Sequence, residues 1–101
     1  MDVDEILEQS EDKLMMLTFT TDWSGASHIQ NIFIDQLSTE FEADIDSLKF
    51  DYKTTDSDKL DYFSVNTIPT TMLLKERKVV GFWEGLTSKN RIRKVIEANL
   101  D

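Results

Sequence analysis

The stretch that most constrains the fold is residues 14–20, LMMLTFT, in which nearly every position is apolar. A strand with one face in water alternates apolar and polar residues, because successive side chains point to opposite faces. A short apolar run without that alternation is typical of a strand buried on both faces, within a parallel or mixed sheet covered by helices. The run therefore predicts an α/β domain with its central strand at residues 14–20.

The neighbouring segments predict the remaining elements. Apolar residues three and four positions apart indicate helices at 2–11, 27–41, 57–63 and 89–99, with strands at 46–53, 70–75 and 78–83. The 27–41 helix rests on the spacing of Ile29, Ile32, Phe33, Leu37 and Phe41. This order predicts a central sheet, part parallel and part antiparallel, with helices on both faces.

Finer signals support three of these segments. In the 46–53 strand, alternation places Leu48, Phe50 and Tyr52 on one face. Glu76-Arg77 is the two-residue turn between the last two strands, although it lacks the Gly or Asn that tight hairpins prefer. Ser88 is an expected N-cap for the last helix, whose inner face carries Ile92, Val95, Ile96 and Leu100.

Length and charge limit the function classes. The chain has 101 residues, which predicts one domain over 1–101. Eleven Lys and Arg against 20 Asp and Glu give a net charge of -9, which disfavours nucleic acid and anionic membrane surfaces. The acidic N-terminus does not resemble a signal peptide, and no run approaches the roughly 18 apolar residues of a membrane span. We therefore expect a cytoplasmic protein.

The sequence has no cysteine, which excludes disulfides, zinc-thiolate sites and thiol catalysis. Ser27-His28 resembles a nucleophile beside a base, but adjacent helix residues do not face each other and no acid is placed to orient His28. The single histidine with scattered carboxylates lacks metal-ligand spacing. We expect no metal, no cofactor and no catalytic residue.

The junction Trp23-Ser24-Gly25-Ala26-Ser27 joins the central strand to the next helix. Its outline is that of a redox active site, with serines where thiols would stand. A hydroxyl at a strand-to-helix junction can also cap the helix by accepting a hydrogen bond from a free N–H group. Capping is therefore the structural alternative for Ser24 or Ser27.

Over nearly its whole length the chain resembles the thioredoxin family. Asp22 to Ser27 corresponds to the Trp-Cys-Gly-Pro-Cys active site, and Ile68-Pro69-Thr70 to the family's Ile-Pro-Thr loop. The closing hairpin to Gly85 and the last helix agree in spacing. The resemblance implies the thioredoxin fold, a central mixed sheet flanked by helices on both faces. It also implies that relatives serve cell redox homeostasis.

Several positions depart from the family pattern. Ser24 and Ser27 stand where the redox cysteines would be, and a hydroxyl cannot form or exchange a disulfide. Thr18 occupies the position of the buried aspartate that relatives use as a proton acceptor, and the accompanying lysine aligns with Lys49 or Phe50. Ala26 replaces proline. The absence of the aspartate at Thr18 favours a chain that is redox-inactive in nature over a laboratory replacement of both cysteines.

The recognition residues of the family are better matched. The resemblance implies that Pro69 follows a cis peptide bond and that Ile68 offers backbone groups to an extended substrate. The peptide-binding surface would comprise Trp23, Gly25, Ala26, Ile68, Pro69 and Gly85, with Leu86 nearby. Alternatively, Pro69 only locks a turn and Trp23 only covers the core.

The leading hypothesis is a redox-inactive binding module for a protein or extended peptide, present as a monomer or weak dimer. The first alternative is a thiol-disulfide oxidoreductase whose cysteines at 24 and 27 were mutated to serine. The second is a structural subunit without a groove, which would form a defined oligomer through another surface.

Overall fold

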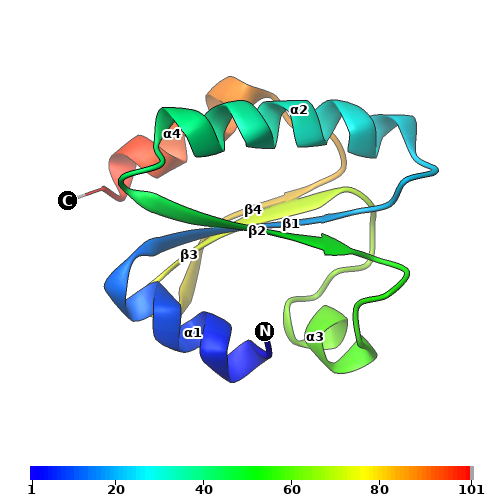
Figure 1. Cartoon of the computed structure of the whole chain (residues 1–101), viewed down its shortest axis with the longest axis horizontal. Helices are drawn as coiled ribbons and strands as arrows, with labels where there is room; N and C mark the ends of the chain where they lie inside the picture. The colour runs from blue at the N-terminus through cyan, green and yellow to red at the C-terminus, as the bar shows by residue number, and fades with distance from the viewer. Residues whose placement is uncertain (101) are drawn as a thin grey trace.

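The computed structural model describes residues 1–100, which contain four helices and four strands (Figure 1). In chain order these are α1 Val3–Asp12, β1 Leu14–Thr20, α2 Gly25–Glu40, β2 Ile45–Asp51, α3 Ser57–Tyr62, β3 Thr70–Lys75, β4 Lys78–Glu84 and α4 Lys89–Ala98. The predicted order of elements is confirmed, and the predicted ends differ by at most two residues. The largest difference at a helix start is in α2, which begins at residue 25 because Ser24 is its N-cap.

The strands form one mixed sheet in the order β2-β1-β3-β4. β1 runs parallel to β2 and antiparallel to β3, and β4 is antiparallel to β3. Figure 1 shows α2 and α4 on one face of this sheet and α1 and α3 on the other. The predicted thioredoxin fold, with helices on both faces of a mixed sheet, is confirmed.

β1 is buried along its whole length, which explains why its sequence does not alternate. Leu14 and Met16 pack in the core under α2 and α4. Met15, Leu17 and Phe19 pack in the core on the α1 and α3 side. Each face of the strand therefore meets a separate apolar layer.

The α1 and α3 side is rich in aromatic side chains. Leu48, Phe50 and Tyr52 pack on this face, as their alternation predicted. The rings of Phe19 and Phe50 stack with centroids 5.0 Å apart. Stacked aromatic pairs add about 0.5–1.5 kcal/mol beyond area burial.

α2 buries Leu37, and its C-cap Phe41 is buried as well, as the apolar spacing indicated, but its buried face differs from the predicted one near the N-terminus. Ile29 and Ile32 are 45% and 55% exposed, whereas the polar Ser27 and Gln30 are fully buried. The helix was predicted correctly, but its inner face is partly polar near its N-terminus. That polar segment underlies the candidate site.

The hairpin turn at Glu76 and Arg77 adopts left-handed backbone, with φ of 51° and 68°, without glycine or asparagine. Ser10, at the end of α1, offers acceptors to both turn amides. Its carbonyl oxygen accepts from the Glu76 N–H at 2.8 Å, and its Oγ accepts from the Arg77 N–H at 2.9 Å. Tertiary hydrogen bonds therefore offset the strain that glycine would avoid.

Candidate functional site

Ser24 begins α2. Its backbone is extended, with φ of -109° and ψ of 120°, and its side chain accepts a hydrogen bond from the Ser27 N–H at 3.2 Å. This is an N-cap, in which the hydroxyl satisfies one of the free amides of the first helical turn. The capping alternative is therefore what the Ser24 side chain does in this fold.

Ser27 lies one turn further along α2 and is fully buried. Its Oγ accepts a hydrogen bond from the backbone N–H of Thr21 at 3.2 Å. Thr21 immediately follows β1, so this contact ties the end of the central strand to the first turn of the helix. Both serine hydroxyls thus stabilise the junction itself.

The strand register identifies what lies beside the position of the family's buried aspartate. Thr18 pairs with Lys49 on β2 and with Thr71 on β3. Phe50 pairs instead with Phe19, so Lys49 is the lysine that corresponds in register. Lys49 forms an exposed ion pair with Asp35 of α2.

Thr18 and Thr71 are both fully buried, on the α2 side of the sheet. Neither hydroxyl has a hydrogen-bond partner within residues 1–100. A threonine hydroxyl does not titrate at physiological pH, so Thr18 provides no proton acceptor on this face of the sheet. The aspartate position is filled by a group without acid-base function.

The other site residues gather at the same end of the sheet. Trp23 follows the carboxyl end of β1, while Pro69 precedes β3, which runs antiparallel to β1. Gly85 follows β4, and its N–H donates to the Pro69 carbonyl oxygen at 2.7 Å. Gly85 has a φ of +78°, which glycine adopts without steric cost. The structure thus brings the three predicted segments to one end of the sheet.

Exposure differs strongly among these residues. Trp23 is 70% exposed, so it does not serve as a cover for the core. Pro69 is buried and Ile68 is half-buried, and the peptide bond between them is cis. Gly25 is exposed, with open space where a Cβ would lie, and Ala26 is half-buried. Leu86, beside Gly85, is 48% exposed.

The backbone of Ile68 is unpaired. Within residues 1–100, neither its N–H nor its carbonyl oxygen makes a hydrogen bond to protein. Its neighbours are engaged: the Thr67 carbonyl oxygen accepts from Thr70 Oγ1, and the Pro69 carbonyl oxygen accepts from Gly85. One donor and one acceptor of Ile68 are therefore unpaired within residues 1–100, at the end of the sheet that also carries the exposed Trp23.

Gln30 is a site residue that the sequence reasoning missed. Its side chain is fully buried and bridges to the backbone of Thr87, accepting from the Thr87 N–H at 2.8 Å and donating to the Thr87 carbonyl oxygen at 3.3 Å. The bridge fixes the segment that carries Gly85 and Leu86 against α2. The available signal was an amide among apolar residues, three positions after Ser27.

His28 does not form a catalytic pair with Ser27. Its Nε2 lies 2.8 Å from the Asp22 carbonyl oxygen, at an exposed position, while Ser27 points into the fold. Among the described residues, no group of three or more His, Asp or Glu side chains is arranged to hold a metal ion. No helix within 1–100 has both the length and the apolar character needed to cross a bilayer.

Comparison with known proteins places this architecture. The family model Thioredoxin matches residues 2–98. Thioredoxin-T of Drosophila melanogaster is 29% identical over 96 residues, which cover 95% of this chain and 60% of that protein. The chain therefore spans about 60% of the length of this curated relative.

Several solved structures have the same fold as this chain. Thioredoxin-2 of the malaria parasite, described as a component of its protein secretion machinery, superposes with a TM-score of 0.80 at 26% identity, covering 86% of this chain and 84% of that one. A further malarial protein gives 0.78 at 26% identity, over 88% and 99%. Fasciola hepatica thioredoxin gives 0.81 over 95% and 89%, and at 19% identity it shows the fold alone. On the match over residues 2–98, this chain belongs to the thioredoxin family.

Proposed function

We propose that this chain is a redox-inactive member of its family that binds an extended segment of another protein. We call the binding region the contact surface, made of Trp23, Gly25, Ala26, Ile68, Pro69 and Gly85. The proposal rests on a contrast between the serine hydroxyls and the residues of the contact surface. The Ser24 and Ser27 hydroxyls are engaged inside the fold, whereas the Trp23 side chain and the Ile68 backbone are available to a partner.

The chemistry of the junction supports the absence of exchange. Disulfide exchange requires a thiolate that attacks a disulfide sulfur, and the positions of the two redox cysteines carry hydroxyls in this chain. Serine can neither form the mixed disulfide nor resolve it. Thr18 supplies no acid or base for such a step.

Binding would proceed by strand addition. The free N–H and carbonyl oxygen of Ile68 can pair with the backbone of an extended peptide, which gives affinity without requiring one sequence. The Trp23 indole then supplies apolar contact area and one N–H donor. The small Gly25 and Ala26 allow the peptide backbone to approach the start of α2.

The charge of the chain favours a protein partner over nucleic acid or an anionic membrane. Two carboxylates flank the contact surface: Asp22 adjoins Trp23, and Glu84 adjoins Gly85. Lys53 Nζ lies 3.8 Å from Asp22 Oδ1 and offsets part of this charge. Within residues 1–100, the Glu84 carboxylate is paired with no cation and accepts a hydrogen bond from the neutral Thr67 Oγ1 at 3.4 Å. We propose neutral or basic segments as the preferred partners of this cytoplasmic module.

A displayed library of random peptides tests the proposal. We expect recovered peptides to bind wild-type protein, and we expect Trp23→Ala and Pro69→Ala each to weaken binding about tenfold or more, as at buried interface anchors. Tyr62→Ala is the matched control, because Tyr62 is an exposed aromatic residue on α3, outside the contact surface. Unchanged binding by both Trp23→Ala and Pro69→Ala would refute the proposed surface.

The alternative is a thiol-disulfide oxidoreductase whose cysteines were replaced by serine. It is favoured by the position of Ser24 at the start of a 16-residue helix, which would lower the pKa of a thiol there. The double variant Ser24→Cys, Ser27→Cys separates the two in an insulin reduction assay. Brisk reduction supports the alternative, whereas weak reduction indicates that Thr18 and Ala26 no longer support exchange. The gene's codons at 24 and 27 give an independent answer.

A further inference from the structure

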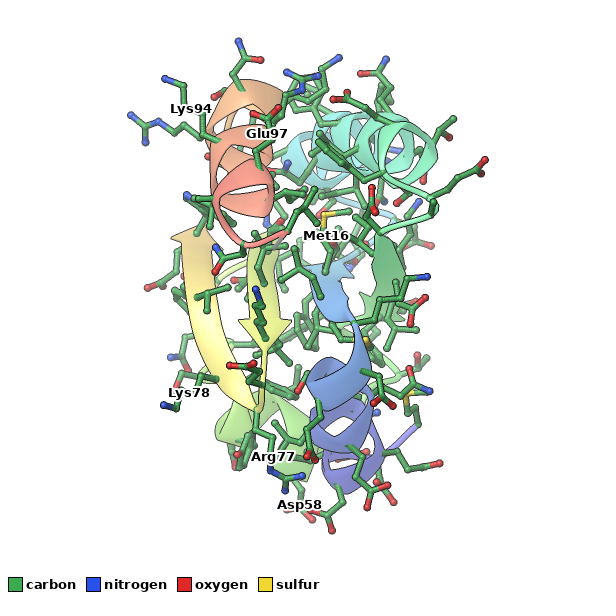
Figure 2. The ribbon with its side chains drawn as sticks, turned by 90° about the vertical axis from the view of Figure 1, so that its left-hand side faces the viewer. Met16, Asp58, Arg77, Lys78, Lys94 and Glu97 are labelled. Carbon is green, nitrogen blue, oxygen red and sulfur yellow. The ribbon has the colours of Figure 1, made fainter. Side chains whose placement is uncertain are left out.

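The strand β4 forms an open edge of the sheet. Within residues 1–100 it is bonded only to β3, and its sequence KVVGFWE contains no proline and no charge between Lys78 and Glu84. Figure 2 shows β4 at the outer side of the sheet, with no described helix or strand beyond it. An edge strand presents a row of unpaired N–H and carbonyl groups that can pair with another chain.

A bulge in β4 gathers its apolar side chains on one face. Val79 pairs with Leu74 and Phe82 pairs with Met72, although Val79 and Phe82 are three residues apart. Leu74 and Met72 belong to the α1 and α3 side of the core, so Val79 and Phe82 share that side. They are 50% and 37% exposed and line an open hollow of about 330 Å³. Leu7, Tyr62 and Phe63 line the same hollow.

β4 is complementary to itself when two copies run antiparallel around a two-fold axis between Val80 and Gly81. In this register, Val79 of one copy lies opposite Phe82 of the other. Both belong to the α1 and α3 side, so the two exposed apolar side chains cover each other. Cross-strand pairs of a β-branched and an aromatic residue stabilise a sheet.

The same register pairs opposite charges. Arg77 of one copy lies opposite Glu84 of the other. Arg77 is on the α1 side, because its Nη1 donates to Glu11 Oε2 of α1 at 2.9 Å. Glu84 is on that side as well, because it pairs with Thr70, the register partner of Phe19. The symmetry forms this ion pair twice.

The side chains on the face toward α2 and α4 also fit this register. Lys78 of one copy lies opposite Trp83 of the other, an arrangement that allows a cation–π contact. Val80 lies opposite Gly81, whose surface is covered within its own copy by the Trp83 ring. In this register each side chain thus meets one from the same side of the sheet.

The distribution of charge permits the β4 strands of two copies to approach each other. Residues 1–74 contain 16 acidic and four basic side chains, whereas residues 75–100 contain three acidic and seven basic ones. The excess negative charge therefore lies outside the segment that forms β4 and α4. Figure 2 shows Arg77 and Lys78 together at one end of β4.

We propose that β4 is a dimerisation edge, which pairs antiparallel with β4 of a second copy in the register that places Arg77 opposite Glu84. The interface is isologous, so each copy contributes the same residues. The residues of the contact surface lie outside this interface, which shares with the peptide-binding proposal only the flanking Glu84. The two contact surfaces would lie at opposite ends of the joined strands and would remain open.

Sedimentation velocity over micromolar to millimolar concentrations, combined with charge reversal, tests this pairing. We expect wild-type protein to dimerise, and Arg77→Glu or Glu84→Arg alone to weaken the dimer about tenfold, because like charges then face each other twice. The double variant Arg77→Glu, Glu84→Arg should restore the dimer. Val79→Lys should weaken it, while Ile32→Lys, at a similarly exposed apolar residue on α2, should not. Circular dichroism checks that each variant is folded.

Backbone amide NMR shifts locate the interface independently. With rising concentration, we expect residues 78–84 to shift and the amides of Trp23 and Ile68 to stay constant. A wild-type protein that stays monomeric at millimolar concentration would overturn the proposal. So would a dimer that charge reversal leaves unchanged, a double variant that fails to restore it, or concentration-dependent shifts confined to Trp23 and Ile68.

Discussion

The serine pair and the contact surface lie at the same end of the sheet but face in different directions. Ser24 and Ser27 direct their hydroxyls to backbone amides of their own junction. Trp23, adjacent to Ser24 in sequence, is 70% exposed, and the Ile68 backbone has no partner within residues 1–100. We propose that serine in place of cysteine removes exchange chemistry from the first half, while the groups of the second half serve contact. Substitutions in the first half should change stability, and those in the second should change binding.

Gln30 joins the two halves, and its loss should have the largest effect. Gln30→Leu leaves the buried N–H and carbonyl oxygen of Thr87 without partners, at about 1–3 kcal/mol for each group. We expect the free energy of unfolding in urea to fall by about 2–6 kcal/mol, and peptide binding to weaken because the Gly85 segment loosens. Gln36→Leu is the control, since Gln36 is an exposed amide on the same helix. Equal stability of the two variants would contradict the bridging role.

Substitution of Ser27 should have the second-largest effect. Ser27→Ala leaves the Thr21 N–H without its acceptor inside the fold, which should lower the free energy of unfolding by about 1–3 kcal/mol. The affinity for a selected peptide should stay within about twofold of wild type in fluorescence anisotropy, a difference below 0.5 kcal/mol. A large loss of affinity with unchanged stability would contradict the structural role of Ser27 and would assign it to the contact surface.

Ser24 should have a smaller effect, because it is half-buried and acts only as a cap. Ser24→Ala should lower stability by about 1 kcal/mol, measured by thermal unfolding. Ser24→Asp should retain the cap and suit the helix dipole, so its stability should match or exceed wild type. If the alanine and aspartate variants were equally unstable, capping would not explain this serine.

The smallest effect concerns an ion pair away from the site. Arg93 donates to both carboxylate oxygens of Glu40 at 2.8 Å, which joins α4 to α2 and lowers the pKa of Glu40 below its usual value of 4.5. A carboxyl with a lowered pKa stabilises the fold above its unfolded pKa, and this contribution is lost as pH falls through the folded value. Arg93→Gln should therefore be slightly less stable than wild type at pH 7. The difference should shrink below about pH 4.5 in thermal unfolding. A difference that is constant with pH would exclude this linkage.

Much of the fold could be predicted because its signals are local. The apolar run at 14–20 is typical of a strand with both faces covered, and the structure buries all of it. The cap at Ser88 follows from a hydroxyl at a helix start, and the same signal narrowed the cap of α2 to Ser24 or Ser27, of which the structure selects Ser24. The placement of Trp23 and the Ile68-Pro69 loop at one end of the sheet follows from element order.

The remaining features depend on contacts between distant segments. The choice between Lys49 and Phe50 required the strand register, which one residue of slip would reverse. The turn at Glu76 is stabilised by Ser10, more than 60 residues away, so its own sequence gives no favourable signal. Gln30 is buried because Thr87 satisfies its amide, and apolar periodicity cannot detect such a pair. For the same reason the apolar spacing placed Ile29 on the inner face of α2, whereas the structure exposes it.

The central claim is that this protein binds a peptide without reacting with it. The most direct test is an NMR titration of the wild-type protein with a peptide selected from the random library. We expect the Ile68 amide and the Trp23 indole N–H to shift together, with slowed hydrogen exchange at the Ile68 N–H as it pairs with the peptide backbone. The peptide should be recovered unchanged. Saturation of binding with both signals unmoved and shifts clustered elsewhere would contradict the account.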